Sequence, residues 1–204
     1  MDYSDVFLAR IDEIERCLKA ECYFAALSLA LTLPDICGKA EYPRDNNGDR
    51  YKKWYNENIG VYEKSPSPYA DGMPYLSGEV VWSLRCSFLH SGNPNIEVRN
   101  SFEDECKVDQ FVIRYGTSLS GDTSHISYVP GQSVSYREYD MNIRPFCGKL
   151  LRAARGYYQE NKEKFNFFNY VLEEENEKPV APEQKEWAIN AIVQMIANEA
   201  TGGK

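Results

Sequence analysis

The sequence contains few residues of the types that bind metal ions. Its 204 residues include only two histidines, His90 and His125, and none of its six cysteines forms a Cys-x-x-Cys pair. Zinc sites need several imidazole or thiolate ligands at short spacing, so we expect no bound metal. The cysteines are scattered and lie mostly among apolar neighbours, which is typical of free thiols in a protein core.

Long apolar runs and targeting signals are also missing. The longest apolar run, residues 22–33, is interrupted by Ser28 and Thr32, and a membrane span needs about 20 consecutive apolar residues. The first five residues lack the basic start of a signal peptide. We therefore expect a cytoplasmic protein with no membrane-spanning helix. Glycine-rich phosphate loops, nucleophile elbows and His-Glu-x-x-His motifs are absent too, so no cofactor is expected.

The net charge of −8 comes mainly from the two ends of the chain. Residues 171–204 hold seven acidic and three basic side chains, and residues 1–30 hold six acidic and three basic ones. The segment between them is nearly balanced. This distribution argues against a broad surface for nucleic acid, but it is compatible with a local site made by a few arginines.

Apolar residues recur at helical spacing along much of the chain. The pattern predicts helices over about 5–19, 20–33, 75–91 and 141–161, with Gly38 as a stop shortly after the second. The second is apolar on nearly every face and should be central in the fold. An acidic linker and a last helix, at about 182–198, are expected within 171–204.

Two other segments depart from helical spacing. Residues 39–77 are rich in turn sequences and contain one short predicted helix, Asp49 to Asn58. Residues 107–139 alternate between apolar and polar side chains, which predicts two or three short antiparallel strands lying against the helices. The expected fold is mainly α: a single domain over 1–204, with a four- to five-helix bundle and a small antiparallel β insertion.

The helix at 75–91 carries the most informative residues, Arg85 and His90. On a helical wheel, its small and polar side chains share one face, which suggests a dimer seam; they are Ser83, Cys86, Ser87 and His90. Arg85 and His90 are about 140° apart around the axis and roughly 7.5 Å apart along it. Ideal geometry therefore places the pair poorly within one chain, whereas a two-fold dimer would gather two copies of each around one cleft.

The same two residue types suit metal-independent RNA cleavage. Histidine titrates near neutral pH and serves as general base or general acid, and a guanidinium stabilises charge on a phosphate. One chain supplies one histidine at this site, and two chains supply both the base and the acid.

The segment Arg85-Cys86-Ser87-Phe88-Leu89-His90, followed by Ser91-Gly92, resembles the signature of the HEPN superfamily, an arginine followed after four to six residues by a histidine. The resemblance covers about residues 5–38, 75–92 and 141–160. It implies a dimeric helical bundle and, as in many members, a metal-independent endoribonuclease of a toxin–antitoxin, phage-defence or RNA-processing system. By the resemblance Arg85 is the phosphate ligand, His90 the general acid or base, and RNA and a cognate antitoxin are partners.

A non-catalytic reading stays open. Active members usually carry a polar residue directly after the arginine, where this chain has Cys86, a weak hydrogen-bonding group. The alternative is therefore a helical module that binds a nucleotide or a partner protein. An arginine and a histidine near a helix C-terminus also simply complement the helix dipole.

Other candidate residues each have two interpretations. Asp35 either orients the site or caps a helix end. The basic side chains of the helix at 141–161 form either a phosphate-binding stripe or a solvated face; they are Lys149, Arg152 and Arg155. His125 is interpreted as a loop or strand-edge histidine.

Overall fold

The computed structural model describes residues 5–64, 74–92, 108–116, 121–128 and 134–168, together with 189, 192 and 193. The chain divides into two compact units, Met1–Val171 and Leu172–Lys204. The single domain over 1–204 stays a prediction, and most of the acidic segment 171–204 belongs to the second unit. The predicted helix at 182–198 lies outside the described residues except at 189, 192 and 193, which are helical and exposed.

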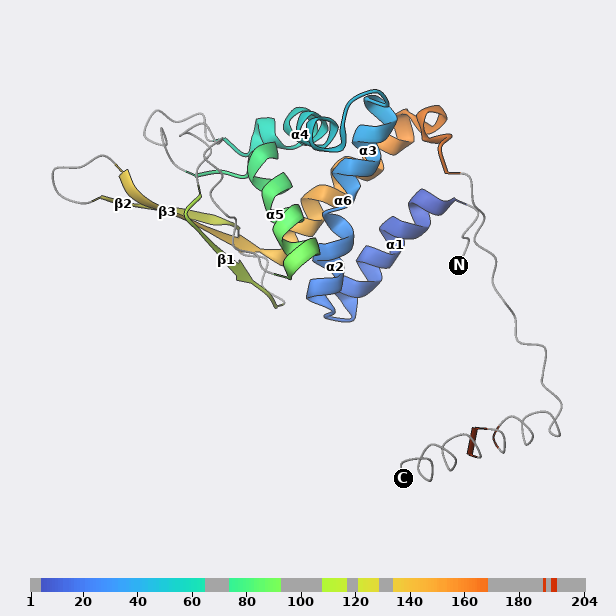
Figure 1. Ribbon diagram of the computed structural model, residues 1–204, viewed down its shortest axis with the longest axis horizontal. Coiled ribbons are helices and arrows are strands. Elements are labelled where there is room, and N and C mark those ends of the chain that lie inside the picture. Colours follow the sequence, from blue (N-terminus) through green and yellow to red (C-terminus); the bar gives the residue numbers. More distant parts are fainter. Residues whose placement is uncertain are drawn as a thin grey trace, which may run out of the picture. The chain divides into compact units, whose positions relative to one another are not determined.

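The first unit is mainly helical, with a small sheet beside the helices (Figure 1). Its α-helices are α1 Val6–Lys19, α2 Tyr23–Ala30, α3 Leu33–Glu41, α4 Asn47–Asn58, α5 Gly78–Ser91 and α6 Ile143–Glu160. Its strands are β1 Gln110–Arg114, β2 Thr123–Tyr128 and β3 Val134–Asn142. Short 3-10 helices lie at Gly60–Tyr62 and Lys162–Phe165. No helix in the described residues is long and apolar enough to span a membrane.

α2 corresponds to the predicted helix at 20–33, and a further helix, α3, follows directly where that prediction ends. α2 ends at Ala30 and α3 begins at Leu33, with Pro34 in the first turn of α3. A proline lacks the N–H that a helix interior uses, but the first turn does not need that N–H, so Pro34 starts a helix instead of ending one. Gly38, predicted as a stop, lies inside α3, where a Cβ would come within 2.6 Å of the Arg50 carbonyl oxygen. The glycine is needed for close approach of α4.

α4 belongs to the core of the first unit. The predicted short helix is confirmed, but it begins at Asn47, where the Asn46 side chain accepts a 3.0 Å hydrogen bond from the Asp49 N–H. Tyr51, Trp54 and Tyr55 on α4 have no exposed surface. Its buried aromatic face belongs to the core, and the helix packs against α3 and α5.

The sheet is mixed, so the prediction of a purely antiparallel insertion was wrong. Its strand order is β1-β3-β2, with β2 antiparallel and β1 parallel to β3. Local alternation reports which side chains share a face, but it carries no information about strand direction, which depends on distant pairing. The predicted packing against the helices is confirmed, because Phe111, Tyr139 and Met141 belong to the same buried cluster as the helices.

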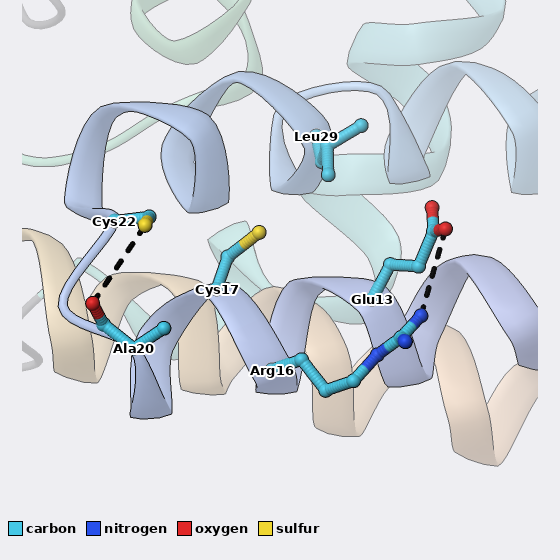
Figure 2. Close-up of a pocket in the computed structure, with 6 residues that line it drawn as sticks. All are labelled: Glu13, Arg16, Cys17, Ala20, Cys22 and Leu29. Carbon is cyan, nitrogen blue, oxygen red and sulfur yellow. Dashed lines mark hydrogen bonds and ion pairs between the residues drawn. The ribbon is translucent and has the colours of Figure 1, made fainter. Parts of the chain in front are cut away.

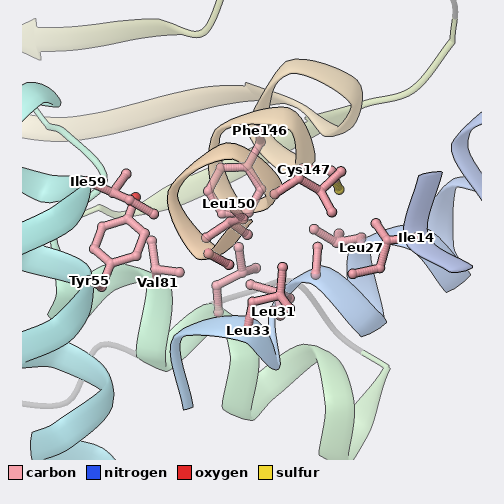
Figure 3. Close-up of a cluster of buried hydrophobic side chains, with 14 of the residues drawn as sticks. Ile14, Leu27, Leu31, Leu33, Tyr55, Ile59, Val81, Phe146, Cys147 and Leu150 are labelled. Carbon is pink, nitrogen blue, oxygen red and sulfur yellow. The ribbon is translucent and has the colours of Figure 1, made fainter. Parts of the chain in front are cut away.

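The buried cluster combines side chains from all six α-helices with side chains from β1 and β3, and Figure 3 shows part of it. Its members from α1 and α2 include Ile14 and Leu27, and those from α6 include Phe146 and Leu150, each with no exposed surface. β3 runs directly into α6, and the Asn142 side chain accepts a 3.3 Å hydrogen bond from the Arg144 N–H at the start of that helix. The sheet and the bundle are therefore one packed body.

Candidate functional site

α5 is held at both ends by specific backbone interactions. The Ser77 side chain accepts a hydrogen bond of 3.2 Å from the Val80 N–H and caps the N-terminus. Gly92, in the left-handed region at φ 65°, ends the helix, as its position after the last turn predicts. α5 also lies very close to α4, since a Cβ on Gly78 would come within 2.7 Å of the Lys52 carbonyl oxygen. These contacts fix the first turn of α5 against α4 and end the helix at Gly92.

Arg85 and His90 meet within one chain. Arg85 Nη1 lies 3.5 Å from His90 Nε2, although ideal wheel geometry places the two residues poorly for contact. The long arginine stem lets the guanidinium reach along the helix towards its last turn. An arginine N–H can only donate, so this contact is a hydrogen bond only when Nε2 is unprotonated, the state that a general base requires. His90 itself is exposed.

Asp35 lies on the other side of the Arg85 guanidinium. Arg85 Nη2 is 3.8 Å from Asp35 Oδ2, while Arg50 Nε and Nη2 donate to Asp35 Oδ1 at 3.0 and 2.8 Å. All three side chains are mostly buried, with exposed fractions of 19, 20 and 13% for Arg85, Asp35 and Arg50. The interpretation of Asp35 as a helix-end cap is wrong, because Thr32 holds that position and Asp35 lies inside the first turn of α3.

The arginines outnumber the carboxylate in this cluster, which we call the Asp35 cluster: Asp35, Arg50, Arg85 and His90. One aspartate faces two guanidiniums, so a positive charge remains beside His90. Arg85 also stacks 5.1 Å from the Trp82 ring, and its buried Nε has no hydrogen-bond partner in the described residues. Such partly desolvated guanidiniums suit an anionic ligand. A phosphate accepts hydrogen bonds from their N–H groups and also balances their positive charge.

Buried aromatic side chains form the floor of the Asp35 cluster. Tyr51 is fully buried, packs 5.1 Å from the Trp82 ring and donates to the Leu31 carbonyl oxygen. Burial raises the pKa of Tyr51 well above its ordinary value, and the positive charge of Arg85 opposes this increase. Tyr51 therefore stays neutral and supports the site without exchanging protons.

The remaining predicted site residues divide into two groups. Ser83 and Cys86 are half-buried on the same helix as Arg85. Lys149 instead binds Glu63 at 2.8 Å and Asp122 at 2.9 Å, beside a separate cavity of about 280 Å³.

The basic stripe expected on α6 is partly neutralised by acids. Arg155 pairs with Glu15 at 2.9 Å, while Arg152 is exposed next to a cavity that Arg155 also lines. His125 is exposed on β2, opposite Glu138 of β3, as a strand histidine.

Arg50 is the site residue that sequence reasoning missed. It lies 15 positions after Asp35, on another helix, and no local spacing links the two. One signal was present, since Asp35 interrupts the apolar stretch 33–37 and a carboxylate that packs there needs a cation.

We expect the Asp35→Ala substitution to destabilise the fold by about 1–3 kcal/mol, because it leaves two mostly buried guanidiniums without their carboxylate. Urea unfolding followed by circular dichroism measures the change. The matched control is Asp45→Ala, which removes the partner of Lys53 in an exposed ion pair of 2.6 Å and should leave the midpoint nearly unchanged. Equal midpoints for both variants would contradict a structural role for Asp35.

Comparisons with known proteins give no functional assignment for this chain. No family model, no curated protein and no solved structure matches this chain.

Proposed function

We propose that the chain is a metal-independent endoribonuclease of the HEPN type, with the Asp35 cluster as its active site. The observation that carries the proposal is the 3.5 Å approach of Arg85 Nη1 to His90 Nε2. The proposal assigns phosphate binding to Arg85 and proton transfer to His90, and this short distance supports it because one phosphodiester can reach both side chains. Arg50 and Asp35 position the Arg85 guanidinium from the side away from His90.

The chemistry follows from these groups. Neutral His90 takes the proton of a ribose 2′-hydroxyl, and the oxygen attacks the adjacent phosphorus. Arg85 donates to the non-bridging phosphate oxygens as charge accumulates on them. The bond to the 5′-oxygen breaks, and that oxygen takes a proton from an imidazolium. The products are a 2′,3′-cyclic phosphate and a free 5′-hydroxyl.

A second copy of the chain supplies the second histidine. One base and one acid act in the same step, and each chain has one histidine in the cluster. The face of α5 that carries Ser83, Cys86, Ser87 and His90 is partly exposed within one chain. Packing two such faces around a two-fold axis brings both His90 side chains to one phosphate.

A test of the overall activity uses purified protein, single-stranded RNA and excess EDTA. The proposal predicts RNA fragments with 2′,3′-cyclic phosphate ends, formed at an unchanged rate when the chelator concentration rises. RNA that stays intact while the protein binds it would instead support a binding module, the reading that Cys86 keeps open.

We expect the Ser83→Arg substitution to abolish dimers and RNA cleavage together, because two like charges facing across a two-fold seam cost several kcal/mol. Sedimentation velocity measures the oligomeric state over a concentration series. Gln159→Arg, on the exposed part of α6, adds the same side chain away from the seam and should change neither property. A Ser83→Arg variant that stays dimeric and active would overturn the proposed seam.

A further inference from the structure

The turn between α1 and α2 has the hydrogen bonds of a Schellman motif. Glu21 is in the left-handed region at φ 59°, and its N–H donates to the Leu18 carbonyl oxygen at 3.4 Å. The Cys22 N–H donates to the Cys17 carbonyl oxygen at 2.8 Å. In this motif the side chains of the two residues that share the second of these hydrogen bonds, five positions apart, are frequently in contact. Here both of those residues are cysteines.

The same hydrogen bond limits how far apart the two cysteines can be. Standard bond lengths and the 2.8 Å hydrogen bond from Cys22 N to Cys17 O keep their Cα atoms within about 7 Å of each other. Disulfides form when Cα atoms are about 4.4–6.8 Å apart, and pairs beyond about 7 Å cannot be joined without backbone movement. The turn therefore holds the two cysteines within bridging range.

Both thiols border one surface cavity of about 450 Å³ between α1 and α2, lined by Glu13, Arg16, Cys17, Ala20, Cys22 and Leu29. Figure 2 shows the Cys17 and Cys22 side chains on neighbouring segments among the residues that line this cavity. Cys22 is exposed and its thiol lies 3.6 Å from the Ala20 carbonyl oxygen, while Cys17 is half-buried. A small reagent can thus reach Cys22 first.

Two other cysteines are shielded from such reagents. Cys37 and Cys147 have no exposed surface, and burial raises the pKa of the Cys147 thiol to about 12. Since the thiolate is the reactive form, these two thiols are inert at neutral pH. They behave as the buried core cysteines that the sequence predicts, whereas Cys17 and Cys22 do not.

We propose that Cys17 and Cys22 form a dithiol modification site that closes to an intramolecular disulfide by exchange with a small-molecule disulfide such as oxidised glutathione. The Cys22 thiolate attacks one glutathione sulfur, forming a mixed disulfide and releasing one glutathione. The Cys17 thiolate then attacks Cys22 Sγ and expels the second glutathione. Two electrons pass from the two thiols to oxidised glutathione, and the two thiol protons end on the two reduced glutathiones.

The test treats the reduced full-length protein with oxidised glutathione, blocks the remaining thiols by alkylation and measures intact mass and non-reduced peptides. Wild type should lose two hydrogen atoms and yield a peptide linked from Cys17 to Cys22. Because the neighbouring thiol acts at a high effective concentration, the glutathione adduct on Cys22 should be at least about tenfold more abundant in Cys17→Ser than in wild type.

Two controls keep the result interpretable. Cys86→Ser should behave like wild type, and Cys22→Ser should give neither the linked peptide nor fast adduct formation. Thermal melts of the reduced variants, together with Cys17→Ala as a second replacement, separate loss of the thiol from loss of the fold. A stable glutathione adduct on Cys22 of the wild-type protein, or a disulfide that joins a different pair of cysteines, would overturn the proposal. The result is independent of nuclease activity.

Discussion

Replacing His90 with alanine is expected to slow RNA cleavage in EDTA by about 10²–10⁴-fold, the usual contribution of a positioned general acid or base. His90 is exposed at the last turn of α5, where its Nε2 lies 3.5 Å from Arg85 Nη1. The substitution therefore removes the proposed proton-transfer group without opening a cavity in the core. Initial rates on a fluorescent single-stranded RNA measure the effect.

The chain provides a matched control for this variant in its other histidine. His125 is exposed on β2, so His125→Ala changes the same residue type at a similar level of exposure. We expect His125→Ala to cleave RNA at the wild-type rate and both variants to melt like wild type. Equal activity of His90→Ala and wild type would remove His90 from the mechanism.

Replacing Trp54 with alanine should destabilise the protein by about 3–5 kcal/mol, the cost of truncating a fully buried large aromatic side chain. Trp54 has no exposed surface, and its ring contacts Tyr157 of α6 edge-on at 5.6 Å between centroids. A loss of stability of this size would show that α4 belongs to the core although turn sequences surround it. Urea unfolding followed by circular dichroism measures the change without depending on tryptophan fluorescence.

Trp54→Phe is the informative companion variant. The indole N–H of Trp54 is buried with no hydrogen-bond partner among the described residues. Phenylalanine keeps most of the apolar surface and removes that unpaired donor, so we expect it to retain most of the stability that alanine loses. An alanine variant within about 0.5 kcal/mol of wild type, the range usual for surface substitutions, would contradict a core position for α4.

The sequence predicted well those features that depend on neighbouring residues. α1 follows its apolar stripe, with Phe7, Ile11 and Ile14 buried, and α5 ends at Gly92 as its glycine indicates. Features set by distant partners were not visible. The parallel pairing of β1 with β3, and the close approach of α3 to α4 at Gly38, depend on tertiary contacts that no local period encodes.

The candidate site shows the same division. Arg85 and His90 were identified because both lie on one helix. The helical wheel, however, gives only the direction of each side chain around the axis and ignores how far a long side chain reaches. Arginine's flexible stem reaches the histidine within one chain, so the pair comes together without a dimer, and in the proposed mechanism the dimer supplies only the second histidine. Asp35 had two interpretations, and Arg50 had none, since their pairing joins two helices.

Our proposal is that the Asp35 cluster cleaves RNA by 2′-hydroxyl attack without a metal. The most direct measurement is the chemical nature of the new RNA ends formed in EDTA by wild type and by His90→Ala side by side. The claim predicts 2′,3′-cyclic phosphate and 5′-hydroxyl ends with wild type and almost none with His90→Ala. Intact RNA with wild type, or ends with a 3′-hydroxyl and a 5′-phosphate, would contradict it.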